Sequence, residues 1–357
     1  MQSVPDSERQ WWSSPYLRML SSPIRICTVT RRYFPSDLLV RLAPFRNPLA
    51  KPSLTESHFL PDGLEHPKFS VRENRTAIYV RCHKAAFDDF ANRAALRRFA
   101  PNPKVHGSLK IQIGHLLRLR VLQEIKVLAN TLRSNRQATL SGPVLRRLTR
   151  SEWEQVKATG SVPFKNAIAI IVAPPPNRDP KTKLRPQPWW QPTLPDSQLA
   201  ILQDSASQPS LPSLPPVSEL LAHVNNSSGS LDEIPNVVPN SRVPLYNATS
   251  LCPLPGHRAA LHEGLSDILN TERHNRRFVD LSETLETTTS LVTGPQKSSH
   301  AFLLRSDEDT LTRADPVPLA IALWRVRLWE GEAENQSYED GWEMGAGWRR
   351  QYAATAL

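Results

Sequence analysis

Proline is the sequence feature that most restricts the fold of this chain, because 33 prolines stand against only 13 glycines among 357 residues. Each proline fixes φ and removes a backbone donor, so prolines interrupt helices and central strands. The scarcity of glycine indicates that these interruptions are turns and extended segments rather than flexible ones. We therefore expect a core of sizeable extent, but not one that uses the whole length of the chain.

Apolar periodicity divides the chain into two patterned regions. Residues 23–172 contain strand-like and helix-like runs of apolar residues. Such runs occur again over residues 257–357, which are rich in Trp. Between them, residues 173–256 are rich in Pro, Ser and Asn, and cannot bury enough apolar surface to offset the entropy of ordering. The sequence predicts an α+β protein, predominantly helical, in two lobes separated by a long Pro/Ser-rich, mostly disordered linker. An alternative left open is that the C-terminal helices pack on the N-terminal lobe and complete one core.

Individual elements can be predicted from their spacing. Apolar side chains at steps of three and four predict a long central helix over residues 109–133. Alternation and β-branched runs predict strands over residues 24–29, 76–82 and 167–172. Residues 319–329 are apolar on nearly every face, which predicts a helix that is buried or docks on a partner.

Local signals predict several helix boundaries. Ser151 to Glu154 has the pattern of a capping box, and Gly160 supplies a left-handed stop. Pro35 to Asp37 offers a start for a short helix that contains Leu38 to Leu42.

Charge is distributed unevenly along the chain. Residues 1–172 carry 28 Lys and Arg against 12 Asp and Glu, whereas residues 173–357 carry 16 against 22. Arginine dominates the basic clusters of the first part, and its planar fork binds phosphate oxygens bidentately. The candidate nucleic-acid-binding residues are Arg93, Arg97, Arg98, Arg118, Arg120, Arg133, Arg136, Arg146, Arg147 and Arg150.

These features favour a non-enzymatic RNA- or ribosome-associated protein that binds the phosphate backbone of structured RNA or a ribonucleoprotein. No zinc-finger, RNP or helix-turn-helix pattern is present, so nothing indicates sequence-specific readout of DNA. In this hypothesis the C-terminal region contacts a protein partner through Trp324, Leu328 and Trp329. The alternative is a protein-protein adaptor or assembly factor that acts through the same helix without binding nucleic acid. In that case the basic half has no role for its positive charge, or it lies on anionic lipid.

Known catalytic patterns are missing from the sequence. The histidines and cysteines lack the spacing of metal ligands, and no Gly-rich loop precedes a P-loop lysine, so we predict no metal and no cofactor. Ser299 and His300 are adjacent in sequence, but catalytic triads are assembled in space. We predict that the protein is not an enzyme, while a site assembled from distant residues stays open.

The N-terminus has features of a targeting segment. Residues 9–36 contain five arginines, several serines and no acidic residue, as mitochondrial presequences do. We predict that residues 1–22 are a mitochondrial targeting segment and that the protein acts in mitochondrial gene expression in the matrix; the nucleus or cytoplasm is the alternative. Three widely spaced cysteines agree with a reducing compartment. The longest apolar runs are far below the ~20 residues of a transmembrane helix.

Overall fold

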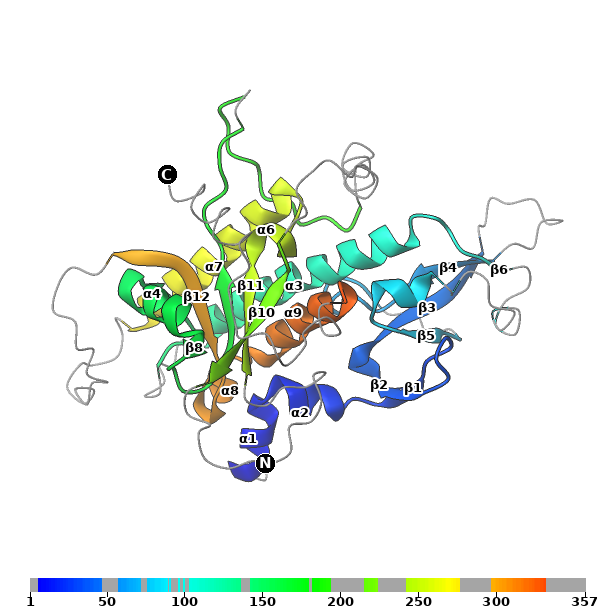
Figure 1. Ribbon diagram of the computed structural model, residues 1–357, viewed down its shortest axis with the longest axis horizontal. Coiled ribbons are helices and arrows are strands. Elements are labelled where there is room, and N and C mark those ends of the chain that lie inside the picture. The colour runs from blue at the N-terminus through cyan, green and yellow to red at the C-terminus, as the bar shows by residue number, and fades with distance from the viewer. Residues whose placement is uncertain are drawn as a thin grey trace.

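The described part of the protein contains three β-sheets and a set of helices that pack on them (Figure 1). The computed structural model describes residues 6–46, 57–71, 76–88, 90, 96, 99, 103–135, 142–179, 182–193, 215–223, 242–276 and 297–331.

The largest sheet has six strands in the order β7-β12-β9-β11-β10-β8. Strand β12 is antiparallel to both of its neighbours, while β9 and β11, and β10 and β8, are parallel pairs. Parallel neighbours need long connections, so this sheet draws its strands from distant parts of the chain. The strands are β7 (Leu145–Thr149), β8 (Ser161–Val162), β9 (Ala167–Val172), β10 (Ser218–His223), β11 (Arg242–Asn247) and β12 (Ser298–Arg305).

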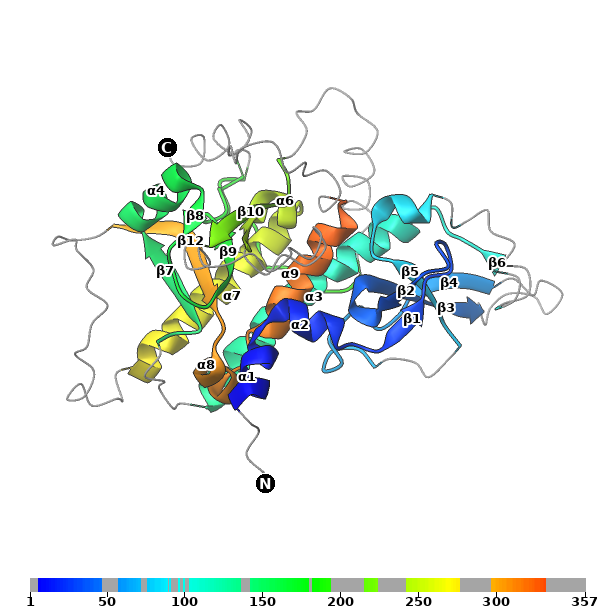
Figure 2. The ribbon, with the colours of Figure 1, turned by 60° about the horizontal axis from the view of Figure 1, so that its bottom comes forward.

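A four-stranded sheet at the other end of the molecule has the order β5-β3-β4-β6, and a two-stranded ribbon, β1-β2, lies beside it (Figures 1 and 2). The ribbon pairs β1 (Ile24–Ile26) with β2 (Tyr33–Pro35). The four strands are β3 (Leu39–Arg46), β4 (Ser57–Pro61), β5 (Ile78–Arg81) and β6 (Pro103–Lys104).

Three long helices connect the two ends. Helix α3 (Leu109–Ser134) contacts both α7 (Pro255–Arg276) and α9 (Val317–Trp329). One continuous apolar core joins these helices to β3 and β5 of the small sheet and to β9 and β12 of the large one. A second apolar cluster forms on the opposite face of the large sheet, where α4 (Arg150–Thr159) contributes Trp153 and Val156.

Short helices complete the core. Helix α1 (Asp6–Ser13) contacts α8 (Glu308–Arg313), and α2 (Pro15–Leu20) lies on α9, where Tyr16 and Met19 are buried. The remaining short elements are η1 (Ser36–Leu38), η2 (Lys84–Phe87) and α6 (Ala248–Leu251). Among the residues that the structure describes, no helix combines the length and apolarity needed to cross a bilayer.

The prediction of a predominantly helical protein in two lobes is wrong. The described residues include twelve strands in three sheets. Strand β12 of the C-terminal region lies between β7 and β9, so the two expected lobes share one sheet. Strands β10 and β11 fall inside the segment expected to be a mostly disordered linker. These strands are stabilised by backbone pairing with partners far away in the sequence, which composition does not reveal.

Local predictions succeeded where the signal was itself local. The helix over residues 109–133, the strand over residues 167–172 and the left-handed stop at Gly160 are confirmed. The capping box was displaced by two residues, since Thr149 rather than Ser151 accepts from the backbone N–H of Glu152. The helix expected after Pro35 is wrong, because the chain makes one 3-10 turn and continues as β3.

Candidate nucleic-acid interface

Two adjacent arginines of the edge strand β7 face opposite sides of the large sheet, because side chains alternate along a strand. The Arg146 guanidinium makes hydrogen bonds of 3.0 Å to Glu152 of α4 and lies 4.5 Å from the ring centroid of Phe164. Arg147 projects to the side of α7, where its Nε donates to the carbonyl oxygen of Ser299. This backbone contact fixes the Arg147 side chain at the surface of the β7-β12 pair.

His300 of β12 lies directly beside Arg147. The Nη2 atom of Arg147 is 3.2 Å from Nδ1 of His300, and its guanidinium lies 5.7 Å from the ring centroid of Phe302. The register of β12 against β7 shifts between Ser298 and Phe302, and His300 stands in this irregular part of the pair.

Further positive groups surround this pair. Arg150 begins α4 and is about two-thirds exposed, and its ion pair with Glu154 is long at 3.9 Å. Arg185 has an exposed side chain and comes from an extended segment. This segment is joined to the first turn of α7, because the N–H of Trp189 donates to the carbonyl oxygen of Gly256. His262 is contributed by α7. We call Arg147, Arg150, Arg185, His262 and His300 the cationic cluster.

The electrostatics of the cluster oppose further positive charge. Burial lowers the pKa of His262, and the positive charges of Arg147 and Arg185 lower it further. Burial likewise lowers the pKa of His300, with additional contributions from Arg147 and Arg150. Both imidazoles are therefore mostly neutral at pH 7, and an anion bound here would relieve the repulsion.

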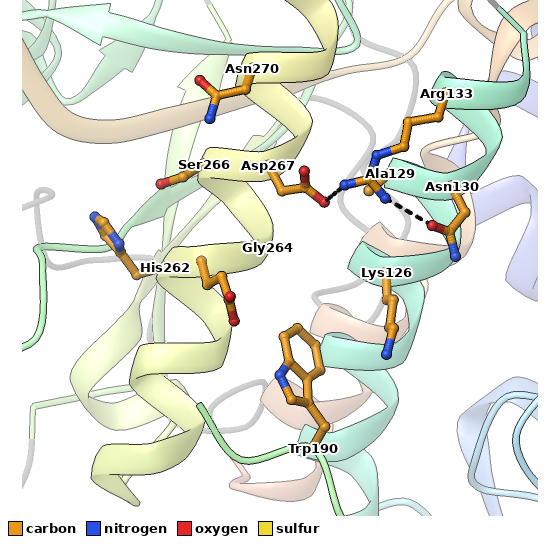
Figure 3. Close-up of a pocket in the computed structure, with 11 residues that line it drawn as sticks. Lys126, Ala129, Asn130, Arg133, Trp190, His262, Gly264, Ser266, Asp267 and Asn270 are labelled. Carbon is orange, nitrogen blue, oxygen red and sulfur yellow. Dashed lines mark hydrogen bonds and ion pairs between the residues drawn. The ribbon is translucent and has the colours of Figure 1, made fainter. Parts of the chain in front are cut away.

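A groove between α3 and α7 begins at His262 and has a volume of about 730 Å³. Figure 3 shows Trp190 between the two helices, while His262 lies on the side of α7 away from α3. Lys126 is placed 5.5 Å from the ring centroid of Trp190, and Arg133 is paired with Asp267 across the groove. The groove thus combines an aromatic side chain with charges of both signs beside the cationic cluster.

The close approach of the two helices depends on Gly264. A Cβ atom at this position would stand 2.5 Å from Cγ2 of Ile125 and 3.5 Å from the indole of Trp190. Glycine therefore lets α7 pack against α3 at the floor of the groove. This contact also sets where Trp190 lies.

The predicted arginines of α3 have internal partners. Arg118 donates to Glu330 at 2.7 Å and to the carbonyl oxygen of Leu251, and its side chain is 12 % exposed. Arg120 donates to Glu124 and to the carbonyl oxygen of Glu65, both at 2.6 Å. These two arginines connect distant parts of the fold rather than presenting their guanidinium groups outward.

The ten predicted arginines do not share one surface. Arg147 and Arg150 belong to the cationic cluster, Arg133 lines the groove, and Arg146 lies on the other face of the sheet. Arg93, Arg97, Arg98 and Arg136 lie outside the described residues.

The predicted partner-binding residues lie inside the protein's own core. Trp324 is 1 % exposed and packs edge-on against Tyr16 at 5.0 Å, and Trp329 is 1 % exposed and packs against Phe87 at 5.2 Å. Leu328 is also buried. A partner could reach these side chains only by displacing neighbouring elements such as α2.

Ser299 and His300 are neighbours on β12, but their side chains have different partners. The hydroxyl of Ser299 donates to the carbonyl oxygen of Leu148 at 2.8 Å and accepts from the backbone N–H of Ala301. It therefore stabilises the pairing of β12 with β7. In the described ranges, no three His, Cys, Asp or Glu side chains are grouped as metal ligands. His115 and His257 stack at 5.1 Å between ring centroids, and both are buried.

Sequence reasoning missed Arg185, His262 and the role of His300 in the cluster. His262 and His300 come from segments without a basic run, and α7 brings His262 beside the β7-β12 pair. No local signal in the sequence could have identified the two histidines, whereas Arg185 ends a short basic run that includes Lys181 and Lys183.

The fold and the cluster together define an α+β protein with a mixed six-stranded sheet and a positively charged sheet edge. No protein family, no curated protein and no solved structure matches this chain.

Proposed function

We propose that this protein is a non-enzymatic RNA-binding protein of a ribonucleoprotein, such as a ribosome, and that it holds the phosphate backbone at the cationic cluster. The observation that carries the proposal is the gathering of five groups, all cationic or able to become so, from β7, β12, α4, α7 and the segment of Arg185. Arg150 of this site is about two-thirds exposed, and its ion pair with Glu154 is long at 3.9 Å.

Phosphate fits the chemistry of the cluster. Guanidinium groups bind phosphate oxygens bidentately, and a neutral imidazole can donate one hydrogen bond to an anion. Binding would favour protonation of His262 and His300, because a negative charge raises the pKa of a neighbouring imidazole. Each phosphate contact releases counterions and makes the affinity salt-dependent.

The adjoining groove favours RNA with unstacked bases over duplex DNA. Trp190 is half-buried beside Lys126, and an indole can stack on a base that has left its helix. Single-stranded loops and bulges of structured RNA offer such bases next to a flexible backbone. The cluster would then hold phosphates while Trp190 contacts a base.

The test is recovery of crosslinked RNA from the tagged full-length protein and from the double variant Arg150→Glu, Arg185→Glu. Both side chains are exposed, so the fold should persist. We expect the charge reversal to reduce recovery by at least about tenfold and to weaken the salt dependence. The matched control, Lys68→Glu with Lys104→Glu, makes the same charge change near the small sheet and should leave recovery unchanged.

Equal recovery from the cluster variant and the wild type would overturn this interface. Absence of RNA from both would overturn RNA binding altogether and favour the adaptor alternative, through a surface other than the buried face of α9. Sequencing the recovered RNA would also identify the compartment, and so test the proposed mitochondrial location.

A further inference from the structure

The N-terminal elements carry an unusual concentration of exposed apolar side chains. Within residues 6–35, seven large apolar residues are between 39 % and 74 % exposed. They are Trp11, Trp12, Leu17, Leu20, Ile24, Ile26 and Tyr33. We call this set the N-terminal apolar surface.

These side chains belong to consecutive elements that run along one side of the molecule. Helices α1 and α2 and the ribbon β1-β2 follow one another along the lower edge in Figure 1 and face the viewer in Figure 2. Leu17 and Leu20 are three residues apart on α2 and therefore share a helix face. The adjacent face of α2 buries Tyr16 and Met19, so Leu17 and Leu20 lie beside the buried face.

The ribbon likewise has an inner and an outer face. Arg25 is paired in register with Phe34, which packs on the core. Arg25 is exposed, and its guanidinium lies 5.9 Å from the ring centroid of Tyr79 on the same side as Phe34. Ile24 and Ile26 alternate with Arg25, and Ile26 is directly opposite Tyr33. The outer face of the ribbon is therefore apolar.

Positive charge exceeds negative charge along these elements, where Asp6 and Glu8 of α1 are the acidic residues. Residues 9–36 contain five arginines and no aspartate or glutamate. Arg31 and Arg32 are exposed at the turn of the ribbon, where Arg31 has a left-handed φ of 60°. The charge complement of such a surface is anionic.

We propose that the N-terminal apolar surface binds the interface of an anionic phospholipid bilayer. Trp and Tyr favour the boundary between head groups and acyl chains, aliphatic side chains insert below it, and Arg pairs with lipid phosphates. The aliphatic residues argue against RNA at this surface, because bases stack on aromatic planes but gain little from Leu or Ile. A bilayer also accepts apolar side chains on a convex surface, without a complementary groove.

This binding would attach the protein peripherally, through side chains rather than a spanning helix. The surface lies on a different side of the molecule from α4, which begins at Arg150 of the cationic cluster (Figures 1 and 2). The inference therefore stands independently of the proposed RNA binding.

The experiment is flotation of the full-length protein with phosphatidylcholine vesicles, with and without phosphatidylserine as the anionic lipid. We expect binding to the anionic vesicles that decreases with salt. The apolar variant Trp11→Ser, Leu20→Ser and the charge variant Arg31→Glu, Arg32→Glu should each bind at least about tenfold more weakly. Urea unfolding of each variant would verify that its fold is retained.

Matched control variants distinguish binding by this surface from nonspecific adsorption to vesicles. Val71→Ser with Leu184→Ser removes two exposed apolar side chains elsewhere, and Lys68→Glu with Lys104→Glu reverses two exposed charges elsewhere. Both control variants should float like the wild type. Failure of the wild type to float with anionic vesicles, or flotation that the two test variants leave unchanged, would overturn the proposal. Loss of a protein or RNA partner from the test variants without loss of flotation would overturn it too.

Discussion

The arginines of the interior and those of the cationic cluster have opposite surroundings. Arg313 of α8 is 3 % exposed and pairs at 2.7 Å with Glu272 of α7, which also accepts from the backbone N–H of Val144. In the cluster, Arg147 instead faces the imidazole of His300, and Arg150 adds a second positive charge. The same residue type therefore stabilises the fold in one region, whereas in the other it lies beside further positive groups.

Truncation tests how far the interior extends, and should have the largest effect. Removal of residues 1–22 would expose Trp324 and lose the buried side chains of Tyr16 and Met19. We expect the free energy of unfolding to fall by roughly 5 kcal/mol or more, measured by urea denaturation. A chain that lacks only residues 1–5 is the control. If the truncated protein were as stable as the full chain, α2 would not belong to the interior, and cleavage of a targeting segment would be favoured.

The buried ion pair provides the next test. Arg313→Met would leave Glu272 buried without its positive partner, and breaking such a pair costs about 3–5 kcal/mol. The double variant with Glu272→Gln should recover part of this loss, because the uncompensated charge is gone. Equal stability of the single and double variants in urea would show that the charge of Glu272 has no effect on the interior.

Acid should weaken the interior through His257. Burial, with the nearby His115 and Arg118, lowers the pKa of His257 from 6.5 to about 3. Below pH 6.5 this histidine binds a proton in the unfolded chain but not in the folded protein. Its contribution to the free energy of unfolding is therefore fully present above pH 6.5. The contribution falls by up to about 1.4 kcal/mol per pH unit between pH 6.5 and about pH 3.

Urea denaturation at pH 7.5 and 5.5 measures this loss, and His257→Gln removes the contribution of this one histidine. The loss between the two pH values should therefore be smaller in the variant than in the wild type. Identical losses in the two proteins would contradict the prediction.

The smallest change in stability is expected in the cluster. Arg150→Met removes an exposed charge and should alter the free energy of unfolding by less than about 0.5 kcal/mol. It should nevertheless raise the pKa of His300, because Arg150 is one of the positive charges that lower it, although burial still holds it down. An NMR titration measures this shift, with Lys68→Met as the control. A pKa of His300 that fell or did not move would indicate that Arg150 lies too far away to belong to the cluster.

The sequence by itself determined elements whose signals are local. The helix over residues 109–133 follows from apolar spacing, the strand over residues 167–172 from its β-branched run, and the end of α4 from Gly160. Each depends on side chains within a few turns of one another, so periodicity and glycine φ preference suffice.

The tertiary structure alone decided which strands pair and which arginines meet carboxylates within the fold. Strand β12 pairs with β7 across about 150 residues of chain, and Arg118 meets Glu330 across 212 positions. The sequence shows charge and composition at each position, but not which distant group will face it. Because the partner of an arginine sets whether that arginine stabilises the fold or meets an anion, the candidate site became visible only with the fold.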